Sequence, residues 1–134
     1  MATAAALTDR PVTQIDDLRE AERPAAWFGD PAEFVVAVRR AMNAPDEPAV
    51  PGWEPAAATR RRVARAVRTL LDSTQRWTEL VLVGHGTAWT LLVAELTARG
   101  PDLDAWERMA MPDLAELDVP TSGGPATVLR DWSG

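Results

Sequence analysis

The sequence contains no cysteine and only one histidine among its 134 residues. Without cysteine there is no disulfide, no thiolate metal site and no cysteine nucleophile. A structural zinc site draws several ligands from histidine and cysteine together, and a single histidine argues against such a site. We therefore expect a protein with neither a metal nor a cofactor.

Long apolar runs and a basic charge are missing as well. The N-terminal residues 1–11 lack the basic start and the long apolar core of a secretory signal, and no later run approaches the length of a membrane span. The formal net charge of -6 repels the phosphates of nucleic acids. We expect a soluble, cytoplasmic, single-domain protein with no nucleic-acid partner and no membrane partner; its 46% hydrophobic content suffices for one core.

The first half of the chain carries helix signals. Asp30, Pro31 and Glu33 have the spacing of an N-cap, a first-turn proline and a capping-box glutamate. The apolar residues that follow share one helical face: Phe34, Val35, Val38, Ala41 and Met42. Residues 2–7 resemble the tail of another helix, and residues 12–15 form a candidate short strand.

A second helix is predicted over residues 56–71, after a proline-rich loop. Its apolar stripe contains Val63 and Val67, and it also carries five arginines: Arg60, Arg61, Arg62, Arg65 and Arg68. We interpret these arginines as a solvated helix face. A site for an anionic ligand on them is the minor alternative.

The second half of the chain contains a predicted strand, turn and helix. The aliphatic run at residues 80–83 is typical of a strand that is buried on both faces of a parallel sheet. The run ends at Gly84-His85-Gly86, and apolar residues then recur at helical spacing until Gly100, which is placed to end that helix. Residues 114–119 and 127–132 are predicted as two strands of a hairpin, with Gly123 and Gly124 in the connection.

The glycine-flanked histidine, His85, is the main candidate for chemistry. Ligands of open parallel sheets gather beyond the carboxyl ends of the strands, and the free N–H groups of a following helix favour a phosphate there. Flanking glycines permit close approach, and imidazole can donate a hydrogen bond, transfer a proton or attack as a nucleophile. We predict a phosphate site at His85, Gly86 and Thr87. The alternative is an ordinary hydrogen-bonded histidine.

A second candidate is Glu20. A charged pair such as Arg19-Glu20 is most often solvated. If residues 12–15 form a strand parallel to residues 80–83, however, Glu20 lies near the same edge of the sheet. A carboxyl group beside a bound phosphate can act as general acid for a leaving alcohol.

Several segments, taken in order, resemble the histidine phosphatase (phosphoglycerate-mutase-like) superfamily. Residues 15–20 resemble the segment that carries the acidic residue of that family, and residues 80–86 resemble the strand and motif of its second histidine. Between them lie three further similar elements: Trp27-Phe28-Gly29-Asp30, Gly52-Trp53-Glu54 and Arg62-Val63.

The resemblance implies an α/β fold, a three-layer sandwich with a mostly parallel sheet. It also implies hydrolysis of the phosphomonoester of a small phosphorylated molecule through a phosphohistidine; mutase activity is less favoured. In that family a first histidine is phosphorylated, a second histidine and two arginines bind the phosphoryl group, and an acidic residue protonates the leaving group. His85 matches the second histidine and Glu20 matches the acid, so both are assigned as catalytic.

The chain departs from the family pattern in its N-terminal part. It has no Arg-His-Gly motif, and neither phosphate-binding arginine has a counterpart. Thr3-Ala4 resembles the pair that follows the later arginine, and Pro55-Ala56 stands where the family often has serine. Residues 1–134 are therefore expected to form a partial histidine-phosphatase-like domain that covers about the C-terminal two-thirds of the family and lacks its first strand.

Three explanations of this departure are open: a gene model that starts too late, a degenerate relative, or a partner chain that supplies the missing strands. The first is favoured because the chain begins within an uncapped helix. We expect the chain as given to be inactive as an enzyme, with a non-catalytic module that binds a phosphorylated ligand as the alternative function. Exposed strand edges would favour homo-oligomers. A serine hydrolase is disfavoured because no Gly-x-Ser-x-Gly elbow occurs.

Overall fold

The structure, a computed structural model, describes residues 4, 6, 8, 9, 11–24, 28–73 and 79–132. These residues form, in chain order, η1 (Asp16–Leu18), α2 (Pro31–Asn43), α3 (Ala56–Ser73), α4 (Gly86–Leu96), α5 (Leu103–Arg108), β1 (Glu116–Asp118) and β2 (Thr127–Arg130). Most of the helix predicted at residues 2–7 lies outside the described residues, as do Thr3 and Trp27 of the family-like segments.

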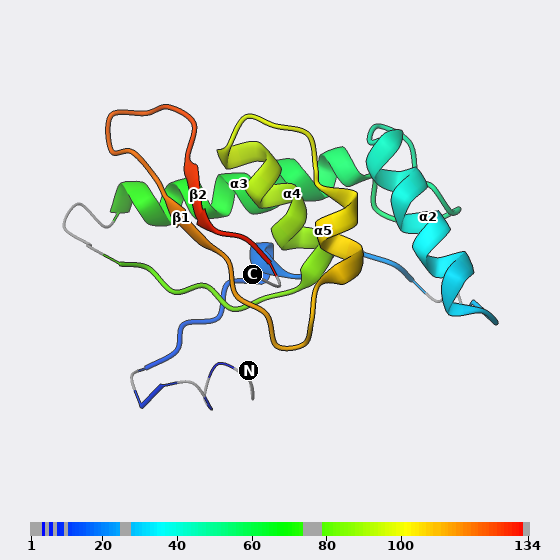
Figure 1. Ribbon diagram of the computed structural model, residues 1–134, viewed down its shortest axis with the longest axis horizontal. Helices are drawn as coiled ribbons and strands as arrows, with labels where there is room; N and C mark the ends of the chain where they lie inside the picture. The colour runs from blue at the N-terminus through cyan, green and yellow to red at the C-terminus, as the bar shows by residue number, and fades with distance from the viewer. Residues whose placement is uncertain are drawn as a thin grey trace.

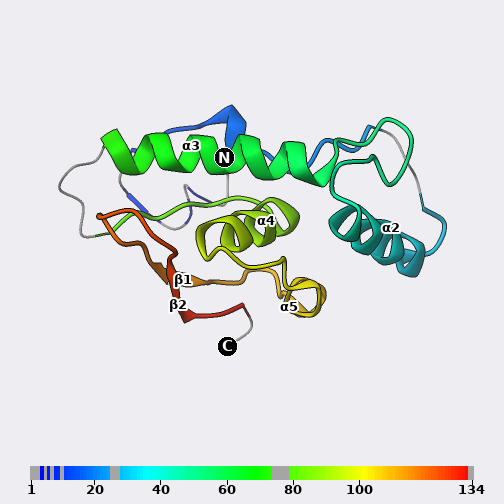
Figure 2. The same cartoon turned by 90° about the horizontal axis from the view of Figure 1, so that it is seen from above.

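The elements are stacked around α4, with α3 on one side and the β1–β2 hairpin and α5 on the other (Figures 1 and 2). Figure 2 shows α3, α4 and the hairpin as successive tiers, with α2 at one end of the molecule. The described residues are mostly helical, and their only sheet is an antiparallel pair. The predicted mostly parallel sheet is therefore not found in this part of the chain, although both helices and strands are present.

The helix α2 begins as its sequence predicts. The side chain of Asp30 accepts a hydrogen bond of 2.8 Å from the Ala32 amide, and Pro31 occupies the first turn. Val38 and Met42 are buried on the predicted apolar face and pack against Trp53. A loop residue of the Gly-Trp-Glu segment thus supplies a core side chain.

The helices α3 and α4 pack against each other in a second core cluster. Val63 and Val67 of α3 are buried against Ala88 and Leu92 of α4. Burying a side chain of this size stabilises the fold by about 1.5–3 kcal/mol, so this contact fixes the position of α4. The Glu95 carboxylate of α4 also binds two arginines of α3, Arg60 and Arg68.

Residues 80–83 do not form the predicted buried strand. Their backbone is assigned no strand, Val81 is 72% exposed, and only Leu82 packs against the second core cluster. Residues 12–15 are likewise not a strand. A β-branched run favours extended backbone, but a strand also needs a neighbour to pair its N–H and C=O groups. No such neighbour pairs with residues 80–83 among the described residues.

The predicted C-terminal hairpin is confirmed with shorter strands. β1 and β2 are antiparallel, Leu117 faces Val128, and the connection contains Gly123 at φ +71°. The Ala126 amide donates to the Leu96 carbonyl at the end of α4. That helix ends at Leu96 and the left-handed position after it is taken by Ala98 at φ 54°, so the prediction that Gly100 ends the helix is wrong.

A membrane-spanning helix is absent from the described part of the chain, since none of its helices combines the necessary length and apolarity.

Candidate functional site

His85 lies directly at the start of α4, as predicted. It is the N-cap residue, with extended backbone at φ -127° and ψ 150°, and its carbonyl accepts a hydrogen bond of 2.9 Å from the Trp89 amide. Its side chain is exposed and makes no capping hydrogen bond. The prediction that a buried strand precedes His85 is wrong for the reason given above.

The two glycines beside His85 admit protein side chains. A Cβ atom built on Gly84 would lie 2.7 Å from Cε2 of Trp89, and one built on Gly86 would lie 3.1 Å from the sulfur of Met109. The first of these approaches is closer than real Cβ atoms make, so residue 84 must lack a side chain for Trp89 to pack there. A close approach does occur at Gly84, but it is made by the side chain of Trp89 and not by a ligand.

Glu20 reaches the same helix end. Its Oε1 accepts hydrogen bonds from the amides of Ala88 at 2.9 Å and Ala21 at 2.8 Å, and its Oε2 accepts one from the amide of Thr87 at 3.2 Å. The first amides of a helix have no partner within the helix and carry a partial positive charge. Glu20 therefore lies at the end of the helix whose N-cap residue is His85, and the Thr87 amide predicted to bind phosphate binds this carboxylate.

Arg23 is a further residue at this helix end, and no pattern in the sequence indicated it. Its Nη2 donates to the hydroxyl of Thr87 at 2.7 Å, and its Cζ lies 5.1 Å from the ring centroids of both Phe34 and Trp53. Burial lowers the pKa of Arg23, and the charge of Glu20 opposes that shift. Arg23 and Thr87 are 64 positions apart in the sequence, so no local pattern could indicate the contact between them.

Arg62 holds the backbone of the segment that carries Glu20. Its side chain is only 9% exposed, so its assignment to a solvated helix face is wrong. Its Nη1 and Nη2 donate to the carbonyls of Asp17, Arg19 and Glu20, at distances of 2.8, 3.1 and 3.2 Å. Its Nε and Nη2 donate to the two carboxylate oxygens of Glu54. Burial of Val63, the next residue, turns this face of α3 inward.

The partly buried Glu54 carboxylate completes this scaffold. It accepts a hydrogen bond of 3.1 Å from the amide of Glu22, whose carbonyl in turn accepts one from the amide of Glu54. Burial alone raises the pKa of Glu54, but hydrogen bonds from Arg62 and from the Glu22 amide outweigh it and lower the pKa to about 2. Glu54 is therefore ionised at neutral pH and neutralises the charge of Arg62.

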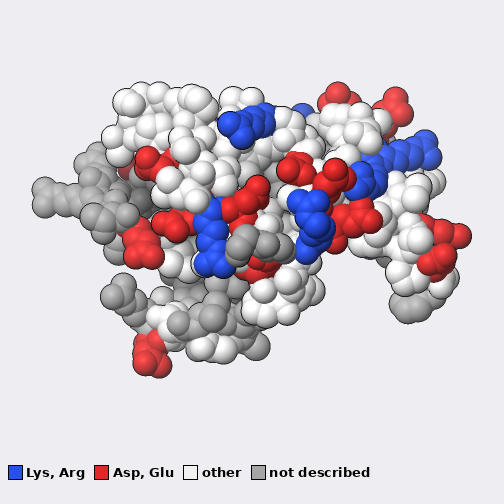
Figure 3. Space-filling model, in the orientation of Figure 1, with Lys and Arg blue, Asp and Glu red and all other residues white. Residues whose placement is uncertain are grey.

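Opposite charges are mixed on the surface. Figure 3 shows arginine and acidic side chains interspersed across the middle of the face that it presents. Ion pairs between helices include those of Arg39 on α2 with Asp104 and Glu107 on α5. An extended patch of one sign, as a nucleic-acid surface would need, is not visible on this face.

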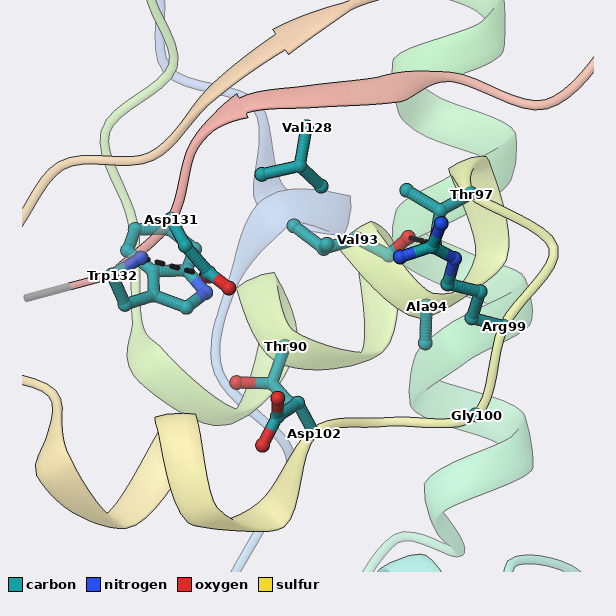
Figure 4. Close-up of a pocket in the computed structure, with 10 residues that line it drawn as sticks. All are labelled: Thr90, Val93, Ala94, Thr97, Arg99, Gly100, Asp102, Val128, Asp131 and Trp132. Carbon is teal, nitrogen blue, oxygen red and sulfur yellow. Dashed lines mark hydrogen bonds between the residues drawn. The ribbon is translucent and has the colours of Figure 1, made fainter. Parts of the chain in front are cut away.

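A separate pocket of about 140 Å³ lies along α4, between that helix, the loop before α5 and the end of β2. Figure 4 shows Arg99 and Trp132 at its two sides, with Val93 and Val128 between them. Neither His85 nor Glu20 lines this pocket, so it is distinct from the helix end where they meet.

Comparison with known proteins identifies one family. The family model of the histidine phosphatase superfamily, branch 1, matches residues 1–133. The searches of curated proteins and of solved structures found no match.

Proposed function

Because the chain belongs to the histidine phosphatase superfamily, we propose that its site serves the hydrolysis of a phosphomonoester through a phosphohistidine. In this proposal Glu20 is the general acid, and His85, with Gly86 and Thr87, binds the phosphoryl group. The substrate is a small phosphorylated molecule. The 134-residue chain by itself supplies only part of the catalytic set.

One observation carries the proposal, namely that the carboxylate of Glu20 is bound at the N-terminus of α4, the helix whose N-cap residue is His85. The carboxylate of Glu20 accepts hydrogen bonds from the amides of Thr87 and Ala88, the second and third residues after the exposed imidazole of His85. These groups come from segments more than sixty residues apart, and Arg62 holds the acidic one in place. An acid and an imidazole at one helix N-terminus suit the cleavage of a phosphate ester.

The proposed reaction has two steps. In the first, a histidine nitrogen attacks phosphorus, the bond from phosphorus to the leaving oxygen breaks, and Glu20 gives a proton to that oxygen. In the second, water attacks phosphorus and gives a proton to the carboxylate of Glu20, the bond from phosphorus to the histidine nitrogen breaks, and inorganic phosphate leaves. His85 donates hydrogen bonds to the phosphoryl oxygens in both steps and steadies their negative charge.

The nucleophile is the part that this sequence does not contain. The reaction uses one histidine as nucleophile and another as phosphoryl ligand, and this sequence has His85 alone and no Arg-His-Gly motif. Removing one preorganised contact to the developing charge typically costs about a hundredfold or more in rate. We therefore expect no turnover from the chain alone, and activity from a form that also carries an Arg-His-Gly segment.

A second candidate is a binding module that holds a phosphorylated ligand without turnover. The lone histidine favours it, because phosphate recognition needs hydrogen-bond donors at the helix end and no nucleophile. The two candidate functions predict different behaviour of a form that also carries an Arg-His-Gly segment. The hydrolase turns over once the segment is present, and the binding module does not.

The test is an assay of the purified chain with p-nitrophenyl phosphate beside His85→Ala and Glu20→Gln variants. We expect no turnover from any of the three. In an extended form with an Arg-His-Gly segment we expect turnover that Glu20→Gln slows. Turnover by the 134-residue chain that disappears in His85→Ala would contradict the proposal and identify His85 as the nucleophile.

A further inference from the structure

We propose that Arg23 is the cationic phosphate-binding residue of this site, contributing a guanidinium group to the phosphoryl oxygens of the ligand. The inference rests on the proposed function, since it assigns a ligand residue to the same helix end. It differs from the family resemblance, which supplied no arginine counterpart in this sequence.

The first support is the position of Arg23. Its Nη2 is hydrogen-bonded to the Thr87 hydroxyl, while the amide of the same threonine is hydrogen-bonded to Glu20. Thr87 therefore contacts both the guanidinium of Arg23 and the carboxylate of Glu20, the group proposed to protonate the leaving oxygen. Thr87, the residue that it contacts, lies two residues after His85 in the chain.

The second support is that the charge of Arg23 has no anionic partner. Four other arginines, Arg39, Arg60, Arg62 and Arg68, each pair with a carboxylate oxygen within 3 Å. In the described part of the chain, which includes every aspartate and glutamate of the sequence, no ion pair involves Arg23.

The unpaired charge is also partly withdrawn from water. Arg23 is half-buried, its Nε is fully buried and has no hydrogen-bond partner, and the rings of Phe34 and Trp53 cover the guanidinium. Aromatic faces attract a cation but do not satisfy its N–H donors. The charge of Glu20 acts on Arg23, yet both oxygens of Glu20 accept hydrogen bonds from backbone amides and neither forms an ion pair with Arg23. An external anion is the partner that Arg23 lacks.

The chemistry of the guanidinium indicates a phosphate. Its planar fork presents N–H groups that match two oxygens of a phosphate, and arginine stays charged even when burial lowers its pKa. A lysine at this position would keep the charge and lose the fork. The hydrogen bond to Thr87 holds Nη2 at the helix end until a phosphoryl oxygen replaces the threonine hydroxyl as acceptor.

The experiment is a titration of the ¹⁵N-labelled chain with inorganic phosphate at constant ionic strength, followed at the Thr87 and Ala88 amides. The variants are Arg23→Met, Arg23→Lys and His85→Ala, with Arg61→Met as the matched control because Arg61 is an exposed arginine of α3. We expect Arg23→Met to weaken the dissociation constant about tenfold or more, Arg23→Lys to weaken it several-fold, and Arg61→Met to leave it unchanged. Circular dichroism checks that each variant is folded.

The outcomes separate this inference from the proposed function. Unchanged binding in Arg23→Met, with binding lost in His85→Ala, overturns the role of Arg23 and leaves the phosphate site intact. No phosphate binding by the unmodified chain overturns both. If Arg23→Met is unfolded, Arg23→Lys decides, since equal binding by that variant overturns the role of the guanidinium fork and a several-fold loss supports it.

Discussion

Two segments meet at the N-terminus of α4, and the rest of the molecule holds them very differently. The acidic segment, residues 16–23, is fixed from α3 by the buried side chain of Arg62, which binds three of its carbonyls. The histidine segment, residues 80–85, is assigned to no helix or strand and is largely exposed, and only Leu82 packs against the second core cluster. The acidic segment is thus anchored to α3 by a buried arginine, whereas the histidine segment packs against the core through one side chain.

The difference shows what each segment needs in order to be ordered. Carbonyl groups of an irregular loop can be satisfied by one long side chain, and a guanidinium with five donors suits this task. An apolar extended run needs backbone partners along its whole length, which a single side chain cannot replace. Stability measurements can test this difference, because changes in the acidic segment should cost far more free energy of unfolding than changes at His85.

The largest effect is expected for Arg62→Met. The substitution keeps the approximate length of the side chain but removes the guanidinium donors to the Glu54 carboxylate and to three backbone carbonyls. Breaking a buried ion pair costs about 3–5 kcal/mol of the free energy of unfolding, and we expect a loss at the lower end of that range because Glu54 is only partly buried. Urea denaturation measures the loss, and Arg61→Met should change stability by less than about 0.5 kcal/mol. Equal effects of the two substitutions would show that the acidic segment does not depend on Arg62.

The second effect is a loss of stability in acid through Glu54. Its pKa is about 2 in the folded chain and about 4.5 when unfolded, so its contribution is complete above pH 4.5 and is lost as the pH falls towards 2. With allowance for partial solvent screening, we expect a loss of about 1–3 kcal/mol over that window. Urea denaturation from pH 5 to pH 2 measures it. Glu54→Gln should be less stable at pH 7 and should lose less across the window; an identical pH dependence would contradict the assignment.

The smallest effect on stability distinguishes Glu20 from His85 at the N-terminus of α4. Glu20→Ala removes an acceptor from the amides of Thr87 and Ala88, and loss of such a cap costs about 0.5–2 kcal/mol. His85→Ala removes an exposed side chain that makes no capping hydrogen bond, so stability should change by less than about 0.5 kcal/mol. Thermal unfolding of both variants tests this order. A greater loss in His85→Ala would show that the imidazole also has a structural role.

The local features of this protein could be predicted from its sequence. The start of α2 was predictable from Asp30 and Pro31, because a cap and a first-turn proline act within one turn of helix. The hairpin was predictable from its two glycines, of which Gly123 adopts a positive φ. The helix after His85 followed from apolar residues at helical spacing. The family was likewise recognisable from short segments in the right order, and the match over residues 1–133 confirms it.

Only the tertiary structure decided which polar groups meet. A pattern of arginines on a helix does not show that Arg62 alone turns inward, because that depends on the packing of Val63 and Val67 against α4. The contacts of Glu20 and Arg23 with Thr87 join positions more than sixty residues apart, which no local signal encodes. The wrong prediction of a strand at residues 80–83 has the same cause. The apolar run is local information, whereas strand pairing depends on a neighbour that is distant in the sequence.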